Sequence, residues 1–73
     1  SKIERCVVYG AGTLGIFVAK ALVEASMEVK LIEKDLQLCH IADEELGGKV
    51  AVINAKYDAH ELYAQEGLER ADM

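Results

Sequence analysis

The sequence contains no proline and no tryptophan, and only one phenylalanine and three tyrosines among its 73 residues. Nothing in it repeats and no stretch has low complexity, so we find no linker that would divide the chain into two domains. No apolar run approaches the roughly 18 residues that a membrane helix needs, and no signal-peptide pattern is visible. We therefore expect a soluble chain with no direct membrane insertion.

Basic residues are also scarce. Eight Lys and Arg face thirteen Asp and Glu, which gives a net charge of −5. This balance excludes nucleic acid as a partner, because nothing would neutralise phosphates along a groove. The two cysteines, Cys6 and Cys39, have no metal-ligand spacing to each other or to a histidine, so we interpret them as reduced, packed thiols of a cytoplasmic protein.

The length sets a limit on the fold. A chain of 73 residues makes one small domain at most, and a domain of this size buries only about 60% of its unfolded surface. Because the sequence begins with Ser1 rather than Met, we expect residues 1–73 to be a single truncated domain of a longer polypeptide.

A glycine-rich turn organises the first part of the chain. An apolar run ending in Tyr9 leads into Gly10, Gly12 and Gly15, the spacing Gly-x-Gly-x-x-Gly. Gly10 allows a sharp turn from the strand, Gly12 leaves bare backbone for a pyrophosphate, and Gly15 lets the following helix lie close to the strand. The helix amino terminus then directs N–H groups and its positive dipole end at a bound anion.

Alternating patterns predict three strands and three helices. The expected order is strand, helix, strand, helix, strand, helix, at residues 5–9, 13–25, 28–33, 35–46, 50–53 and 59–66. Right-handed crossovers between parallel strands give an α/β, Rossmann-like half, with a three-stranded parallel sheet in the order 3-2-1. The third strand is a continuous apolar run, which is typical of a parallel sheet covered on both faces. The first strand keeps an open edge, so we expect a dimer or pairing with chain outside the sequence.

Helix faces and helix ends follow from the same patterns. Asp35 is a good N-cap, Asp58 and Glu61 form a capping box, and Gly47 and Gly67 end their helices. The residues expected to face inward are Leu14, Phe17, Val18, Ala21, Leu22 and Ala25 in the first helix, and Leu36, Cys39, Ala42 and Leu46 in the second.

Glu33 ends the second strand, about 20 residues beyond the glycines, where dinucleotide-binding folds hold ribose hydroxyls. A carboxylate there favours NAD over NADP, because it would repel a 2′-phosphate. The plainer alternative stays open: the glycines make only a tight corner, and Glu33 forms a surface ion pair of little consequence. His40 and His60 have no acid or nucleophile partner in the pattern, and no catalytic residues are identifiable.

The whole chain resembles the N-terminal half of a regulator of potassium conductance domain, the TrkA N-terminal type of NAD-binding domain. The matching segments are Val7–Gly15, Ala19–Leu22, Val29–Asp35, Ile41–Leu46 and Glu61–Asp72, of which the last looks like the run into a fourth strand. The resemblance implies a regulatory, non-catalytic domain of a Trk-type or Ktr-type potassium uptake system or channel. It also implies a cytoplasmic position, peripheral to the inner face of the plasma membrane through a membrane potassium transporter subunit, and assembly as a dimer or ring.

The same resemblance implies a nucleotide site. NAD(H) is the first expected ligand, with ATP, ADP or AMP as others. The turn residues Gly10, Ala11, Gly12, Thr13, Leu14 and Gly15 would surround the diphosphate, with Glu33 on the adenosine ribose and Lys34 beside it. The chain departs from the family after the third strand, where Ala55-Lys56 replaces the usual Gly-Asp. Lys56 then either meets a phosphate, with Tyr57 against the base, or marks a copy that has lost its ligand.

Two other functions stay open at this point. The chain has the pattern expected of a cofactor-binding fragment of an NAD-dependent oxidoreductase whose catalytic half lies elsewhere. A dehydrogenase needs a general acid or base beside the nicotinamide, and the sequence supplies none. The other alternative is a nucleotide-free scaffold that holds a dimer together.

Overall fold

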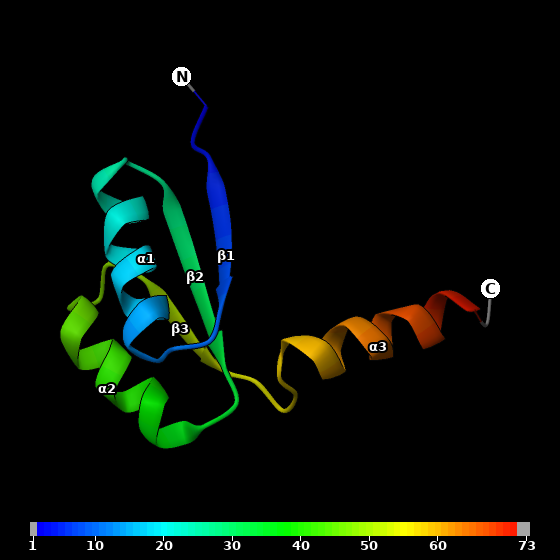
Figure 1. Ribbon diagram of the computed structural model, residues 1–73. Helices are drawn as coiled ribbons and strands as arrows, with labels where there is room; N and C mark the ends of the chain where they lie inside the picture. Colours follow the sequence, from blue (N-terminus) through cyan, green and yellow to red (C-terminus); the bar gives the residue numbers. More distant parts are fainter. Residues whose placement is uncertain (1, 72–73) are drawn as a thin grey trace.

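The computed structural model describes residues 2–71 and has an α/β architecture (Figure 1). The elements are β1 (Arg5–Tyr9), α1 (Thr13–Glu24), β2 (Glu28–Glu33), α2 (Leu36–Leu46), β3 (Ala51–Asn54) and α3 (Ala59–Ala71). All three strands are parallel, and β2 lies between β1 and β3. The predicted order 3-2-1 is therefore confirmed, and β3 begins one residue later than expected.

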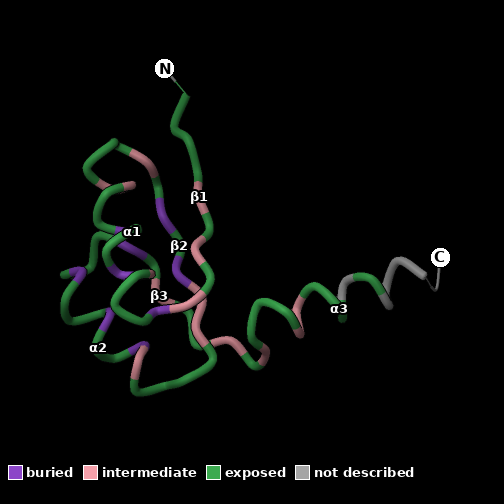
Figure 2. Tube along the Cα trace, in the orientation of Figure 1, coloured by how far each residue is buried: buried purple, intermediate pink, exposed green. Residues whose placement is uncertain are grey.

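α1 and α2 lie on the same face of the sheet (Figure 1). Two successive right-handed crossovers in one direction place their helices on one side. The core forms between these helices and the sheet, where the buried residues shown in purple in Figure 2 gather. Its centre is Leu31 of β2, which is fully buried, and Ala19 of α1 and Ala42 of α2 lie against it with no exposed surface.

The predicted inward face of α1 was wrong for most of its residues, although Leu22 does pack against the core. Leu14 and Phe17 are 74% and 69% exposed, whereas Ile16 and Ala19 are buried. α1 is apolar on nearly all sides, so periodicity alone did not identify the face that meets the sheet. Small residues determine which face of α1 is buried. Gly15 and Ala19, four positions apart, lie on the side of the helix that approaches the sheet most closely.

The second helix follows the prediction in most respects. Asp35 caps α2 by accepting hydrogen bonds from the N–H groups of Gln37 (2.8 Å) and Leu38 (3.2 Å). Gly47 follows the helix in the left-handed conformation, with φ of 57°. Three of the four residues expected inside are buried, but Leu36 is 56% exposed, because it occupies the first turn at the edge of the packed surface.

The third helix differs from the prediction. α3 does not end at Gly67 but continues to Ala71. A helix-interior glycine costs only about 1 kcal/mol relative to alanine, and good helix formers surround this one. α3 projects away from the sheet (Figure 1), and Tyr63 on it is 80% exposed. The expected run into a fourth strand is helical as far as Ala71, and Asp72 and Met73 lie outside the described residues.

The opposite face of the sheet was expected to be covered. Among the described residues no element lies on it, and Val7, Tyr9 and Ile53 there are 50%, 52% and 39% exposed. The open edge of β1 was predicted: within residues 2–71, β2 is the only strand that pairs with β1. Within residues 2–71, the expected covering of both faces of the sheet is therefore not found.

Candidate functional site

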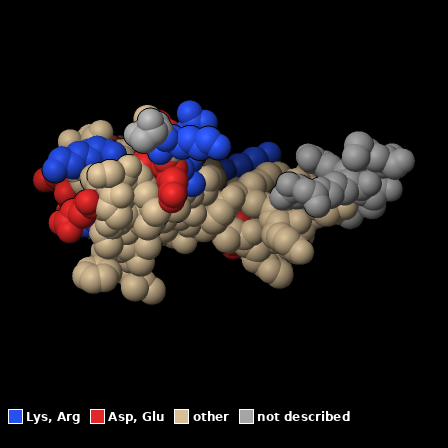
Figure 3. Space-filling model, turned by 90° about the horizontal axis from the view of Figure 1, so that it is seen from above, with Lys and Arg blue, Asp and Glu red and all other residues tan. Residues whose placement is uncertain are grey.

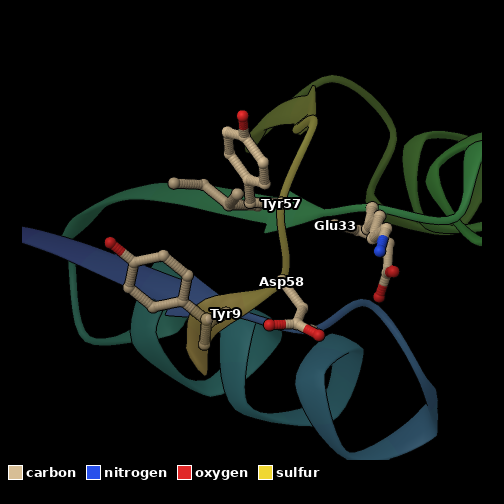
Figure 4. A pocket seen from close by; sticks show the side chains of 8 residues that line it. Tyr9, Glu33, Tyr57 and Asp58 are labelled. Atoms are coloured by element: carbon tan, nitrogen blue, oxygen red, sulfur yellow. The ribbon is translucent and has the colours of Figure 1, made fainter. Parts of the chain in front are cut away.

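The carboxyl ends of the three strands meet at one edge of the sheet, where ligands bind in open α/β folds. A cleft of about 240 Å³ lies there, between the end of β1, the end of β2 and the segment that leads into α3. In the view of Figure 4, Asp58 lies between Tyr9 and Glu33, and Tyr57 stands above them. The lining residues are Tyr9, Gly10, Ile32, Glu33, Lys34, Tyr57, Asp58 and Ala59.

The glycine turn has the geometry that its sequence predicts. Gly10 has φ of 104°, a backbone conformation that L side chains rarely adopt. A Cβ at Gly15 would lie 1.8 Å from the Gly10 carbonyl oxygen, so only glycine fits this contact. A Cβ at Gly12 would meet nothing within 4 Å. Gly10 and Gly15 are therefore needed for the fold itself, and the open side of Gly12 is free for a ligand to approach.

The amino terminus of α1 faces the turn without a side-chain cap. Gly12 is the N-cap residue, and its carbonyl accepts the first helical hydrogen bond from Ile16 N–H at 3.0 Å. The N–H groups of the first turn, including Thr13 and Leu14, have no acceptor within the helix. Ala11, Gly12 and Thr13 line a second cleft, shared with Leu38, Ile41 and Glu45 and separate from the first in its lining.

Glu33 connects this turn with the second helix. Its Oε1 accepts a hydrogen bond from Ala11 N–H, and its Oε2 accepts one from Asp35 N–H, each at 2.8 Å. These two bonds, the one from Ala11 foremost, hold the pKa of Glu33 below its ordinary value of 4.5. The carboxylate is thus ionised near neutral pH, and each of its oxygens has one protein donor.

Asn54 is a site residue that the sequence analysis missed. Its side-chain amide donates to the carbonyl oxygens of Glu33 (3.1 Å) and Lys34 (2.8 Å), and Ala55 N–H also donates to the Glu33 carbonyl. The end of β3 thereby fixes the backbone from which the Glu33 side chain extends. A polar residue at the end of an apolar strand was the available signal.

Lys34 lies in the cleft with a partner that was not predicted. Its Nζ forms an ion pair with Glu61 Oε1 at 3.0 Å, which raises the pKa of Lys34. Glu61 is also part of the predicted capping box, since its N–H donates to Asp58 Oδ1 at 2.8 Å and lowers the pKa of Asp58. The first turn of α3 is thus attached to the end of β2 beside the cleft.

Lys56 and Leu14 do not line the cleft. The Nζ of Lys56 lies 5.6 Å from the centre of the Tyr57 ring, a distance that allows a cation–π contact. Tyr57 itself lines the cleft. Leu14 directs its side chain to solvent, so its backbone N–H is the group that could meet a ligand.

Charges of both signs share the surface. On the face shown in Figure 3, Lys and Arg side chains lie beside Asp and Glu side chains instead of forming a basic groove. Within the described residues, no helix is long and apolar enough to cross a membrane. The described residues place a carboxylate, the backbone N–H groups of a helix amino terminus and an aromatic wall at this edge of the sheet.

Comparison with known proteins places the chain in a family. The TrkA-N domain family matches residues 6–73. A "Trk system potassium uptake protein TrkA homolog" of Archaeoglobus fulgidus is 36% identical over 63 residues, which are 86% of this chain and 14% of that relative. The chain therefore spans about a seventh of the relative's length. No solved structure matches it significantly. With the glycine turn, the acidic end of β2 and the parallel sheet, these matches show that the chain belongs to the TrkA-N domain family.

Proposed function

We propose that this chain is the nucleotide-sensing domain of a Trk-type potassium uptake system and that it binds NAD(H), with ATP, ADP and AMP as the other candidates. One observation carries the proposal: the open side of Gly12, the uncapped amino terminus of α1 and the ionised Glu33 lie around the same edge of the sheet. A diphosphate and a ribose require these groups in this order along a dinucleotide.

The arrangement supports NAD(H) over a 2′-phosphorylated dinucleotide. Glu33 is ionised and would repel a 2′-phosphate. Lys34 is the nearby cation that would offset this repulsion, but it is already paired with Glu61. Tyr9 and Tyr57, which line the cleft, offer aromatic surface to an adenine. Lys56 lies beside the Tyr57 ring and does not line the cleft.

The link to a potassium uptake system rests on the TrkA-N family and on the name of the relative from Archaeoglobus fulgidus. On this basis the domain works on the cytoplasmic side of a membrane potassium transporter subunit and passes a nucleotide-dependent change of shape to it. Assembly as a dimer or ring is supported by the uncovered apolar face of the sheet, where Val7, Tyr9 and Ile53 are 50%, 52% and 39% exposed. The open edge of β1 gives a further surface for pairing.

Thermal unfolding with and without each nucleotide tests the proposal. A ligand at about 100 times its dissociation constant stabilises a domain by roughly 2.7 kcal/mol, a shift of several degrees for this size. We expect NADH or NAD to give the largest shift. The Gly12→Val and Glu33→Ala variants should lose it, and Glu28→Ala, at the opposite end of the same strand, should keep it.

The control matches the test closely, since Glu28 is also a glutamate of β2 and its ion pair with Arg5 is exposed. No shift with NADH, NAD, ATP, ADP or AMP in the unsubstituted protein would refute nucleotide binding. An equal loss of the shift in Glu28→Ala would show that the effect of Glu33→Ala reports general destabilisation.

A further inference from the structure

Glu33 makes contacts that a residue kept only for a ribose would not need. Its two oxygens accept hydrogen bonds from Ala11 N–H, 22 positions away in the sequence, and from Asp35 N–H, two positions away. The first belongs to the glycine turn and the second to the N-cap of α2. One carboxylate therefore joins the loop after β1 to the start of α2.

The Ala11 N–H has a particular need for this partner. Ala11 is only 1% exposed, and a buried N–H without an acceptor is costly. The backbone pairing of β1 with β2 stops one residue earlier, at the 2.8 Å bond from Gly10 N–H to the Ile32 carbonyl. Glu33 Oε1 thus supplies an acceptor to Ala11 N–H just beyond the last backbone hydrogen bond between the two strands, where the chain has already turned away.

The turn itself has few other means of holding its shape. Gly10 and Gly12 have no side chains to pack, and glycine has the most backbone freedom to lose. Glu33, in contrast, is anchored on its own backbone, because its carbonyl accepts from both Ala55 N–H and the Asn54 amide. A fixed side chain therefore meets a turn that lacks side chains of its own.

We propose that Glu33 is a positioning residue for the glycine turn: its carboxylate fixes the Gly10–Gly12 backbone and the start of α2 before any ligand is present. An ionised carboxylate has about four acceptor sites, and two are used here. The others stay available to ribose hydroxyls, so a nucleotide would add to this arrangement without displacing it. That last consequence rests on the proposed nucleotide binding, whereas the positioning role does not.

Amide NMR of the ligand-free, ¹⁵N-labelled protein tests the positioning role directly. As the pH falls, the amide signals of Ala11 and Asp35 should shift together, with one midpoint below 4.5, because both report the same carboxylate. Hydrogen exchange should be about 10-fold or more faster at Ala11, at Asp35 or at both in Glu33→Gln than in the unsubstituted protein, in line with the strength of a hydrogen bond to a charged group.

The Glu33→Gln variant keeps the shape of the side chain but places an amide donor where one of the two N–H groups needs an acceptor. Glu28→Gln, on the same strand, should leave Ala11 exchange unchanged. If Ala11 and Asp35 do not titrate together in the unsubstituted protein, or if Glu33→Gln leaves hydrogen exchange unaltered at both Ala11 and Asp35, the positioning role is wrong. The titration needs no variant, so it decides the question even if Glu33→Gln fails to fold.

Nucleotide addition then separates the two proposals. NADH and ADP are added to the unsubstituted protein in the same experiment. Joint titration of the two amides without binding of either nucleotide would support positioning and refute the proposed ligand. Nucleotide binding without joint titration would support the proposed ligand and refute the positioning role. Glu33 would then act on the ribose alone.

Discussion

Gly15→Ala should destabilise the domain strongly, although alanine is the best helix former and Gly15 lies inside α1. A Cβ at this position would lie 1.8 Å from the Gly10 carbonyl oxygen and 2.8 Å from the Gly10 carbonyl carbon. Real Cβ atoms essentially never lie closer than 3.0 Å to such an atom. The Cβ and the Gly10 oxygen would therefore have to move apart by about 1.2 Å. Both atoms are backbone, and no side chain can rotate to relieve the clash.

The expected loss combines two opposing effects. Overpacking costs typically 1–3 kcal/mol, and this contact lies at or above the upper end because the turn is held on both sides. The better helix propensity of alanine returns about 1 kcal/mol. We therefore expect a net loss of about 2 kcal/mol or more, which for a domain of this size lowers the melting temperature by roughly 8–16 °C.

The assay is thermal and urea unfolding followed by circular dichroism, with Gly12→Ala as the matched control. Gly12 lies in the same turn, but a Cβ there would meet nothing within 4 Å and its φ is −75°. That variant should stay within about 1 kcal/mol of the unsubstituted protein, the scale of an N-cap change. If Gly15→Ala unfolds at the same temperature as Gly12→Ala, the close contact between α1 and the turn does not exist in solution.

Three further predictions concern the core, the cap of α2 and acid stability. Leu31→Ala should cost about 2–5 kcal/mol, enough to leave much of the protein unfolded at 25 °C by circular dichroism, since Leu31 has no exposed surface. Asp35→Ala should cost about 1 kcal/mol in urea unfolding because it removes the hydrogen bonds to Gln37 and Leu38, and Asp35→Asn should retain most of the stability. Because the folded state holds the pKa of Glu33 below 4.5, its contribution is fully present above that pH and is lost as the pH falls through the folded pKa. Unfolding titrations from pH 5 downward should therefore show a loss of stability that is smaller in Glu33→Gln, and equal pH dependence in the two proteins would contradict this reasoning.

Much of the fold could be predicted from local signals. Strand–turn–helix order, the positive φ at Gly10 and the caps at Asp35 and Asp58 each depend on a few neighbouring residues, and the structure confirms them. The family resemblance depends on the same segments and is confirmed by the match over residues 6–73. The roles of the site residues in nucleotide binding stay predictions, because they concern a ligand.

Apart from the length of α3, the errors share one physical cause, which is that they concern packing between distant segments. Because α1 is apolar on nearly all sides, its sequence pattern did not fix which face is buried. The contacts of Gly15 and Ala19 with the sheet fix it. The length of α3 depended on the weakness of one glycine as a helix breaker. The contacts of Asn54 with the end of β2, and the ion pair of Glu61 with Lys34, exist only once β3 and α3 have been placed beside the end of β2.

The sequence by itself determined the order of the elements, the parallel sheet, the family and the acid that ends β2, because periodicity, turn chemistry and crossover handedness are local or topological rules. The tertiary structure alone decided which face of α1 is buried and what the Glu33 carboxylate holds. Both depend on distances between atoms that are up to 22 residues apart in the chain, and such distances exist only once the sheet has formed.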